Sequence, residues 1–405
     1  MIKKIIKTLS SKGGKMDNKK INFVIDKIPR SGIRRIMDKA IELDPKRKKI
    51  IHLEVGEPHE PTSKKICEYI SGAALNGFTK YTQNAGFLEL RKTIKEKLAK
   101  DDIFVSENNI FVTPGATYGV AVAIGIIINP GDEVLVPDPG YPNFPSVVRH
   151  YGGIPKFYTL DEKNNFQTDI NEIKLLTAEK TKMVIINSPS NPTGAVLKEK
   201  QIKDLVNFTS QNNIWLLSDE VYEAFVFNGQ HTSPLKYPDV DNVVGIYSFS
   251  KSYNITGLRV GYTVSRNEKF CNGLIKAQEL YISCAPSTSQ IAAIKILKNC
   301  EDIKVDLKNK FKMKLDTALD ILGENVKYLP EGAFYILINI SKTGLSSNEF
   351  ADILLEEKQV AVAPGITFGP LSDRYIRVAL TADIEQLKEG LNRIKNCLNK
   401  YTGEK

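Results

Sequence analysis

Short apolar runs recur through the middle of the chain and alternate with segments of helical periodicity. Four of these runs are "DEVLVPDP" (132–139), "KMVIINSPS" (182–190), "IWLLSDE" (214–220) and "VVGIYSFS" (243–250). Apolar runs of this length are typical of strands buried on both faces, and the helix-length segments between them favour crossover connections. The pattern predicts an α/β fold with a mostly parallel central sheet and helices on both faces.

Two longer segments place apolar residues three or four positions apart, which predicts helices. One begins near Gly86 in "GFLELRKTIKEKLAK", and the other covers 302–322 in "DIKVDLKNKFKMKLDTALDIL". Beyond the second helix lie three further apolar runs, "FYILINI", "VAVAPG" and "YIRVAL". We interpret these runs as strands of a second, α+β unit.

A chain of 405 residues is longer than one simple core usually supports, so we expect two domains. Residues 61–298 are predicted to form the large domain, and 16–60 together with 299–405 the smaller one. Residues 1–15 contain five lysines and no acid. We interpret them as a mis-assigned start, with Met16 as the native one, or as a flexible extension. A short targeting or surface-binding segment is the alternative, although its apolar stretch is too brief for a secretory signal.

Composition excludes several classes of function. The net charge of +9 is concentrated in residues 1–49, which carry +11, so the remaining chain carries −2 and shows no basic face for nucleic acid. No segment approaches the ~20 apolar residues of a membrane helix. The five cysteines are scattered without a C-x-x-C pair, which predicts neither a disulfide framework nor a metal site. A reducing cytoplasm is the expected location.

Polar residues follow the predicted strands at the end where open parallel sheets bind ligands. They are Tyr141, Asn191, Asp219, Tyr222, Ser250 and Lys251. In addition, Gly115-Ala116-Thr117 precedes a helix-like stretch and is placed to offer backbone amides to an anion. Each residue alone has an ordinary explanation as a helix cap, a turn residue or a surface side chain. Their joint occurrence carries the functional hypothesis.

The motifs "NPTG" (191–194), "SDEVY" (218–222) and "SFSKSYNITGLRVGY" (248–262) together resemble class I/II aminotransferases of the aspartate/aromatic type. The match runs in order from Gly56 to Arg377. The resemblance implies the pyridoxal-phosphate-dependent fold type I and the cofactor pyridoxal 5'-phosphate. It also implies ping-pong transfer of an amino group from an L-amino acid to a 2-oxo acid, with 2-oxoglutarate as the expected acceptor. The alternatives are a C–S β-lyase or other eliminase of the same fold and, least favoured, a non-catalytic binding protein.

The resemblance assigns the catalytic roles to Lys251, Asp219 and Tyr222, and places Asn191 and Tyr141 beside the cofactor ring. Lys251 forms the Schiff base with the cofactor and then acts as the base that moves a proton. Asp219 keeps the pyridine nitrogen protonated, since opposite charges ~4 Å apart interact by about 4 kcal/mol at an effective dielectric constant of ~20. Tyr222 and Asn191 donate hydrogen bonds to the cofactor's phenolate oxygen, and Tyr141 stacks on its ring.

The resemblance also implies how the cofactor phosphate and the substrate are bound. Ser248, Ser250, Arg259 and the amides of Ala116 and Thr117 bind the phosphate, and Tyr81 reaches the phosphate of a neighbouring subunit, which implies a homodimer with shared sites. Arg377 binds the substrate α-carboxylate, helped by Asn191 and the backbone of Gly56.

Two details of the resemblance complete the expectations. Glu279 stands where members specific for dicarboxylic substrates often have an arginine, so the donor stays open among aspartate, aromatic, alanine-like and broad choices. The family keeps cis prolines in two tight strand exits, so we expect the Asp138–Pro139 and Asn191–Pro192 bonds to be cis, although most X–Pro bonds are trans.

Overall fold

The computed structural model describes residues 23–46 and 49–403. The expectations for residues 1–15 and for Met16 as the start fall outside this part. No helix in it is long and apolar enough to cross a membrane.

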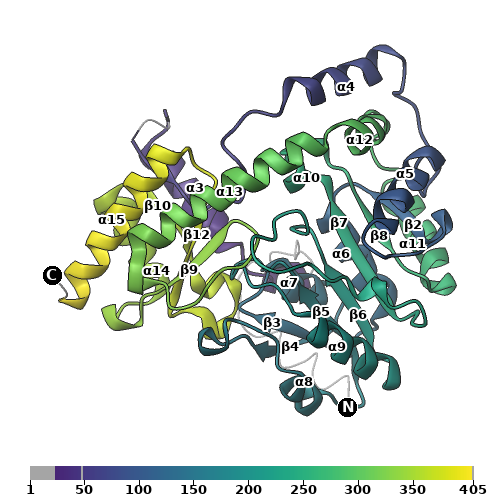
Figure 1. Ribbon diagram of the computed structural model, residues 1–405. Helices are drawn as coiled ribbons and strands as arrows, with labels where there is room; N and C mark the ends of the chain where they lie inside the picture. Colours follow the sequence, from purple (N-terminus) through teal and green to yellow (C-terminus); the bar gives the residue numbers. More distant parts are fainter. Residues whose placement is uncertain (1–22, 47–48, 404–405) are drawn as a thin grey trace, which may run out of the picture.

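The central element is a seven-stranded sheet with the order β2-β8-β7-β6-β5-β3-β4 (Figure 1). Its strands are β2 (Ile110–Thr113), β3 (Glu133–Asp138), β4 (Ile154–Thr159), β5 (Thr181–Asn187), β6 (Trp215–Asp219), β7 (Val243–Ser248) and β8 (Gly261–Val264). Strands β4, β3, β5, β6 and β7 pair in parallel, whereas β8 is antiparallel to both β7 and β2. All four apolar runs of the middle region form strands, which confirms the mostly parallel sheet.

Both faces of this sheet are covered, because successive side chains of a strand point to opposite sides. Val184 and Leu216 pack in one core with helices α5, α9 and α12, whereas Met183 and Leu217 pack in another with α6, α7 and α11. The helices of this region are α4 (Lys64–Leu75), α5 (Leu88–Ala99), α6 (Ala116–Ile127), α7 (Asn143–His150), α8 (Ile170–Leu176), α9 (Glu199–Gln211), α10 (Phe249–Ser252), α11 (Glu268–Tyr281) and α12 (Ser287–Asn299). The predicted helix after Gly86 is α5.

A third core joins the two ends of the chain. It contains Ile36 and Leu53 near the N-terminus together with Phe311, Leu354 and Leu391 near the C-terminus. Around it lie two small sheets: β1 (Ile51–His52) parallel to β10 (Val360–Ala361), and β11 (Ala363–Pro364), β12 (Tyr375–Ala379) and β9 (Tyr335–Asn339) in antiparallel order. The helices are α2 (Phe23–Lys27), α3 (Gly32–Leu43), α13 (Glu301–Leu322), α14 (Ser347–Lys358) and α15 (Ile384–Thr402).

The long helix predicted over 302–322 is α13, which extends from α12 toward the yellow α15 in Figure 1. The expected strand in "VAVAPG" is interrupted, since β10 pairs with β1 and β11 pairs with β12. The N- and C-terminal segments therefore pack together as expected, while the boundaries at residues 60/61 and 298/299 stay a prediction.

Candidate active site

A cavity of ≈ 700 Å³ opens at the carboxyl ends of β5, β6 and β7. It brings together twelve of the thirteen predicted site residues: Gly56, Ala116, Thr117, Tyr141, Asn191, Asp219, Tyr222, Ser248, Ser250, Lys251, Arg259 and Arg377. Tyr81 does not line this cavity; its side chain is 85% exposed. The cavity lies where the topology of an open parallel sheet predicts a ligand site.

Lys251 lies in the short helix α10, directly after β7. Its Nζ donates a hydrogen bond to the carbonyl oxygen of Gly56 at 2.7 Å. The pKa of the Lys251 amine is lowered to about 8, mainly by burial; the charge of Glu57 opposes this shift, and the charges of Arg377 and Arg259 support it. A lysine with this pKa is about one-tenth neutral at pH 7, far more than an ordinary lysine, and a nucleophile or general base requires the neutral form.

Asp219 ends β6 and is buried. Among the described residues, the one hydrogen bond that its carboxylate accepts comes from the backbone N–H of Val221, at 3.3 Å. The pKa of Asp219 is raised to about 7, mainly by burial; the hydrogen bond from Val221 opposes this shift, and the neighbouring charge of Glu220 adds to it. A carboxylate so poorly compensated favours a cationic partner, such as a protonated pyridine nitrogen.

An anion-binding corner is built at the start of α6. Ala116 is the first residue of this helix, whose initial N–H groups carry the positive end of its dipole. The exposed Arg259 lies beside it, so close that a Cβ atom added to Gly115 would collide with its Nη2. Ser248 Oγ accepts from the backbone N–H of Ser250 at 3.1 Å, so its own O–H is available to donate. A phosphate group fits this set of donors.

Arg377 on β12 is buried, with 1% of its surface exposed. Nη1 donates to Asn191 Oδ1 at 3.0 Å, and Nη2 donates to the carbonyl oxygen of Glu54. The guanidinium stands 4.5 Å from the centroid of the Tyr335 ring, and its Nε has no partner among the described residues. Burial lowers the pKa of Arg377 from its ordinary value. Its planar fork faces the cavity and suits a carboxylate.

Tyr222 forms a contact that the sequence does not predict: its hydroxyl lies 2.8 Å from the hydroxyl of Tyr335. Tyr141 accepts a hydrogen bond from Asn143 Nδ2 at 3.0 Å and lines the cavity beside them. Tyr335 carries no sequence signal, because it sits in an apolar run that reads as an ordinary core strand.

Other lining residues also escape sequence reasoning: Ser31, Ile33, Arg34, Glu57, Asn143 and Thr256. Arg34 is the most consequential, since its charge has no ion-pair partner among the described residues. It belongs to a lysine- and arginine-rich segment, where no single cation stands out. Its position in the cavity became visible only with the fold.

The expected cis bonds Asp138–Pro139 and Asn191–Pro192 are both confirmed. The Ser188–Pro189 bond is also cis, which we did not predict.

The model of the family "Aminotransferase class I and II" matches residues 48–394 of the chain. The chain belongs to this family. It is similar to the aspartate aminotransferase of Pyrococcus horikoshii, with 34% identity over 96% of this chain and 100% of the relative. It is also similar to aromatic-amino-acid aminotransferase 2 of Thermococcus litoralis, with 31% identity over 91% of this chain and 95% of the relative.

Among solved structures, the aspartate aminotransferase from Thermus thermophilus with maleate matches with a TM-score of 0.88. The identity is 26%, and the match covers 94% of this chain and 100% of that one. This class I and II aminotransferase therefore has the fold type I architecture, and the expected enzyme class is confirmed.

Proposed function

We propose that this aminotransferase uses pyridoxal 5'-phosphate to move an amino group from an L-amino acid to a 2-oxo acid, with 2-oxoglutarate as the acceptor. The observation that carries the proposal is the Lys251 amine, whose pKa is about 8, in one cavity with the buried acid Asp219 and the anion-binding corner at α6. A lysine amine, an acid for a ring nitrogen and a phosphate site are the three features that this cofactor requires.

Each residue has a role in holding the ligands. When bound, the cofactor supplies an aldehyde for covalent attachment of amines and a ring that withdraws electrons. Asp219 holds a proton at the ring nitrogen, and Tyr222 and Asn191 orient the ring through hydrogen bonds to its phenolate oxygen. Arg377 binds the α-carboxylate and so aims the Cα–H bond at Lys251, whose amine would take the proton from Cα and deliver it to C4′ of the cofactor. Because both substrates use the same groups, the two half-reactions alternate at one site in a ping-pong mechanism.

A homodimer with shared sites is part of the same proposal. Tyr81 is 85% exposed, and Phe78, Leu280 and Tyr281 are also exposed although they are large and apolar. The loop around Tyr81 packs on the segment after α11, since Asn84 Nδ2 donates to the Ser283 carbonyl oxygen at 2.7 Å. Apolar groups gathered on one surface are typical of a protein interface. We propose that a second chain covers this surface and that Tyr81 reaches the partner's cofactor phosphate.

The test of the chemistry is reduction with borohydride followed by peptide mapping, which should label Lys251. An L-amino acid added alone should convert the bound cofactor to its amine form and release the matching 2-oxo acid. Release of ammonia and pyruvate instead would support the C–S β-lyase alternative, which the names of the relatives do not favour. A label on another lysine would overturn the assignment.

The test of the shared site mixes two inactive variants, Tyr81→Ala and Lys251→Ala, under conditions that allow subunit exchange. In a mixed dimer, one site has both residues intact, so activity should return. Persistent inactivity with verified exchange would show that Tyr81 does not serve the partner's site. We also retain the cytoplasm as the proposed location, because the cysteines are free.

A further inference from the structure

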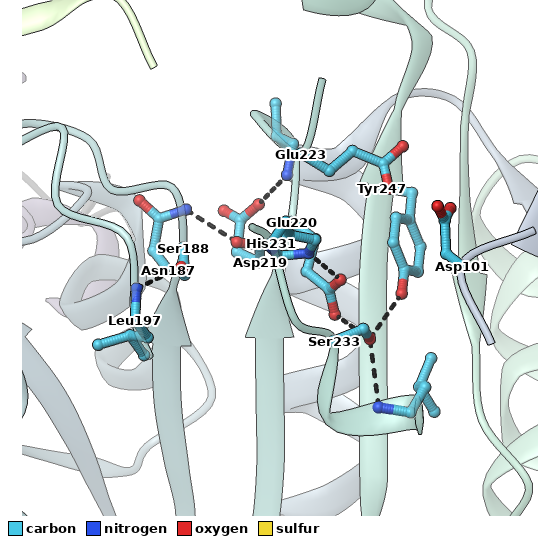
Figure 2. A network of polar contacts seen from close by, with 12 residues as sticks. Asp101, Asn187, Ser188, Leu197, Asp219, Glu220, Glu223, His231, Ser233 and Tyr247 are labelled. Atoms are coloured by element: carbon cyan, nitrogen blue, oxygen red, sulfur yellow. Dashed lines mark hydrogen bonds and ion pairs between the residues drawn. The ribbon is translucent and has the colours of Figure 1, made fainter. Parts of the chain in front are cut away.

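A second buried carboxylate lies directly behind Asp219. Glu220 is the next residue, and its fully buried side chain points to the opposite side of the strand (Figure 2). Its Oε2 lies 2.7 Å from His231 Nε2, and its Oε1 accepts a hydrogen bond from Ser233 Oγ at 2.8 Å. None of these three residues belongs to the cavity or to the chemistry proposed above.

The network continues away from the cavity. Ser233 Oγ lies 3.1 Å from the hydroxyl of Tyr247, and Lys97 Nζ stands 5.4 Å from the centroid of the Tyr247 ring. Lys97 in turn forms ion pairs with Glu223 at 2.6 Å and with Asp101 at 3.3 Å. The charged groups around Glu220 are therefore two further acids and two basic residues, Lys97 and His231.

The charge state of His231 decides the net charge of the buried cluster around Glu220. Burial lowers the pKa of His231, but the hydrogen bond and charge of Glu220 and the charge of Glu223 raise it more, against Lys97. The net shift is upward, so the imidazolium is more favoured here than in a free histidine. Nδ1 has no partner among the described residues. The proton that an imidazolium carries on Nδ1 is therefore stabilised by the charge of these carboxylates and not by a hydrogen bond of its own.

We infer that His231 is a positioning residue of the aminotransferase reaction: paired as an imidazolium with Glu220, it offsets part of that carboxylate's charge and favours the ionised form of Asp219 opposite the cofactor's ring nitrogen. The inference rests on the proposed function. Without the imidazolium, two adjacent buried carboxylates would repel each other more strongly, and Asp219 would take up a proton more readily. A protonated Asp219 no longer stabilises a positive ring nitrogen, so the ring would withdraw electrons less strongly.

The first experiment measures the charge of His231 in the cofactor-free protein. The chain has only four histidines, so labelled-histidine NMR gives few resonances, and His231→Asn identifies the relevant one. His231→Gln serves the same purpose if the asparagine variant does not fold. The inference expects imidazolium shifts for His231 at pH 7.5 and their loss in Glu220→Gln. A neutral His231 at pH 7.5 overturns it.

The second experiment compares the affinity of the protein for two probes, pyridoxal 5'-phosphate and its analogue in which a C–H group replaces the ring nitrogen. The ratio of the two affinities isolates the contact between the ring nitrogen and Asp219. An uncompensated charge one residue away is expected to raise the pKa of Asp219 by about one unit, so His231→Asn should lower the ratio about tenfold. The exposed His150 supplies the control, since His150→Asn should leave the ratio unchanged.

The double variant separates charge from structure. Glu220→Gln removes the charge that His231 cancels, so Glu220→Gln combined with His231→Asn should restore the ratio to within about threefold of the unmodified chain. A merely structural role predicts that the double variant is at least as impaired as His231→Asn, and this outcome overturns the inference. If the unmodified chain binds neither probe, the proposed function fails, whereas normal binding with a neutral His231 refutes only the present inference.

Discussion

Replacing Lys251 with methionine should make the cofactor-free protein more stable at pH 7. The folded protein holds the pKa of Lys251 at about 8, against an ordinary value of 10.5 for an exposed lysine. The folded state therefore binds fewer protons than the unfolded chain at neutral pH, and this site lowers the free energy of unfolding. The penalty is largest below pH 8 and declines as the pH approaches 10.5.

The size of the effect follows from the same two values. At pH 7 the penalty is about 3 kcal/mol, and at pH 9.5 it falls to about 1 kcal/mol. Methionine loses the hydrogen bond from Nζ to the Gly56 carbonyl oxygen, which contributes about 1 kcal/mol. Lys251→Met should therefore gain about 2 kcal/mol at pH 7 and close to nothing at pH 9.5.

The assay is urea unfolding of the cofactor-free protein at both pH values and at one fixed protein concentration. Lys97→Met is the matched control, because this lysine is also largely enclosed but pairs with Glu223 at 2.6 Å. Although burial lowers the pKa of Lys97, the charges of its acidic neighbours raise it well above the ordinary value. Its removal leaves a carboxylate unpaired, so Lys97→Met should lose about 3–5 kcal/mol.

The reasoning would be refuted if Lys251→Met were less stable than the unmodified protein at pH 7. It would also fail if the gain grew with rising pH, since the sign of the proton linkage would then be opposite. Equal effects of the two lysine substitutions would show that burial alone, rather than pairing, governs both sites.

Three further predictions concern ligands. Gly115→Ala should weaken pyridoxal 5'-phosphate binding about tenfold, because the new Cβ displaces Arg259. Gly77→Ala, at a similar φ of +80° but with no atom within 4 Å, should lower the stability by only the ~1 kcal/mol of backbone strain and leave the affinity unchanged. Equal affinities of the two variants would contradict this. Arg377→Lys should lower kcat/KM about 100-fold for α-amino acids, as the bidentate fork is lost, and an unchanged kcat/KM would remove Arg377 from the substrate site. Arg34→Gln should raise KM about tenfold for 2-oxoglutarate but not for pyruvate, because Arg34 is a cavity-lining cation without an acidic partner in the described part of the chain and is free to bind a second carboxylate. A parallel rise for both acids would show that Arg34 does not bind the second carboxylate.

The central sheet was predictable because its strands are buried on both faces and therefore read as apolar runs. The polar residue after each run then had to lie at the carboxyl edge of the sheet, which is where Asp219 and Lys251 are found. The order and spacing of a few motifs added the family. The local sequence was therefore enough to predict the site residues that the central sheet positions.

Contacts made across long sequence separations were not predictable. Tyr335 meets Tyr222 across 113 residues, and nothing in its apolar surroundings distinguishes it from a core tyrosine. The division of "VAVAPG" into β10 and β11 likewise depends on partners elsewhere in the chain. His231 gave no signal, because its role depends on a carboxylate that lies next to Asp219 but faces away from the cavity.

The pairing of β1 with β10 also limits the order in which parts of the protein can form during synthesis. Ile51 pairs with Val360, which the ribosome adds 309 positions later (51 to 360). At about 5–20 residues per second, strand β1 waits roughly 15–60 seconds for its partner. During that interval all seven strands of the central sheet are synthesised, while β1 still has no strand to pair with. Arg377 emerges later still, so under the proposed function a nascent chain would be able to meet the cofactor well before it could hold a substrate.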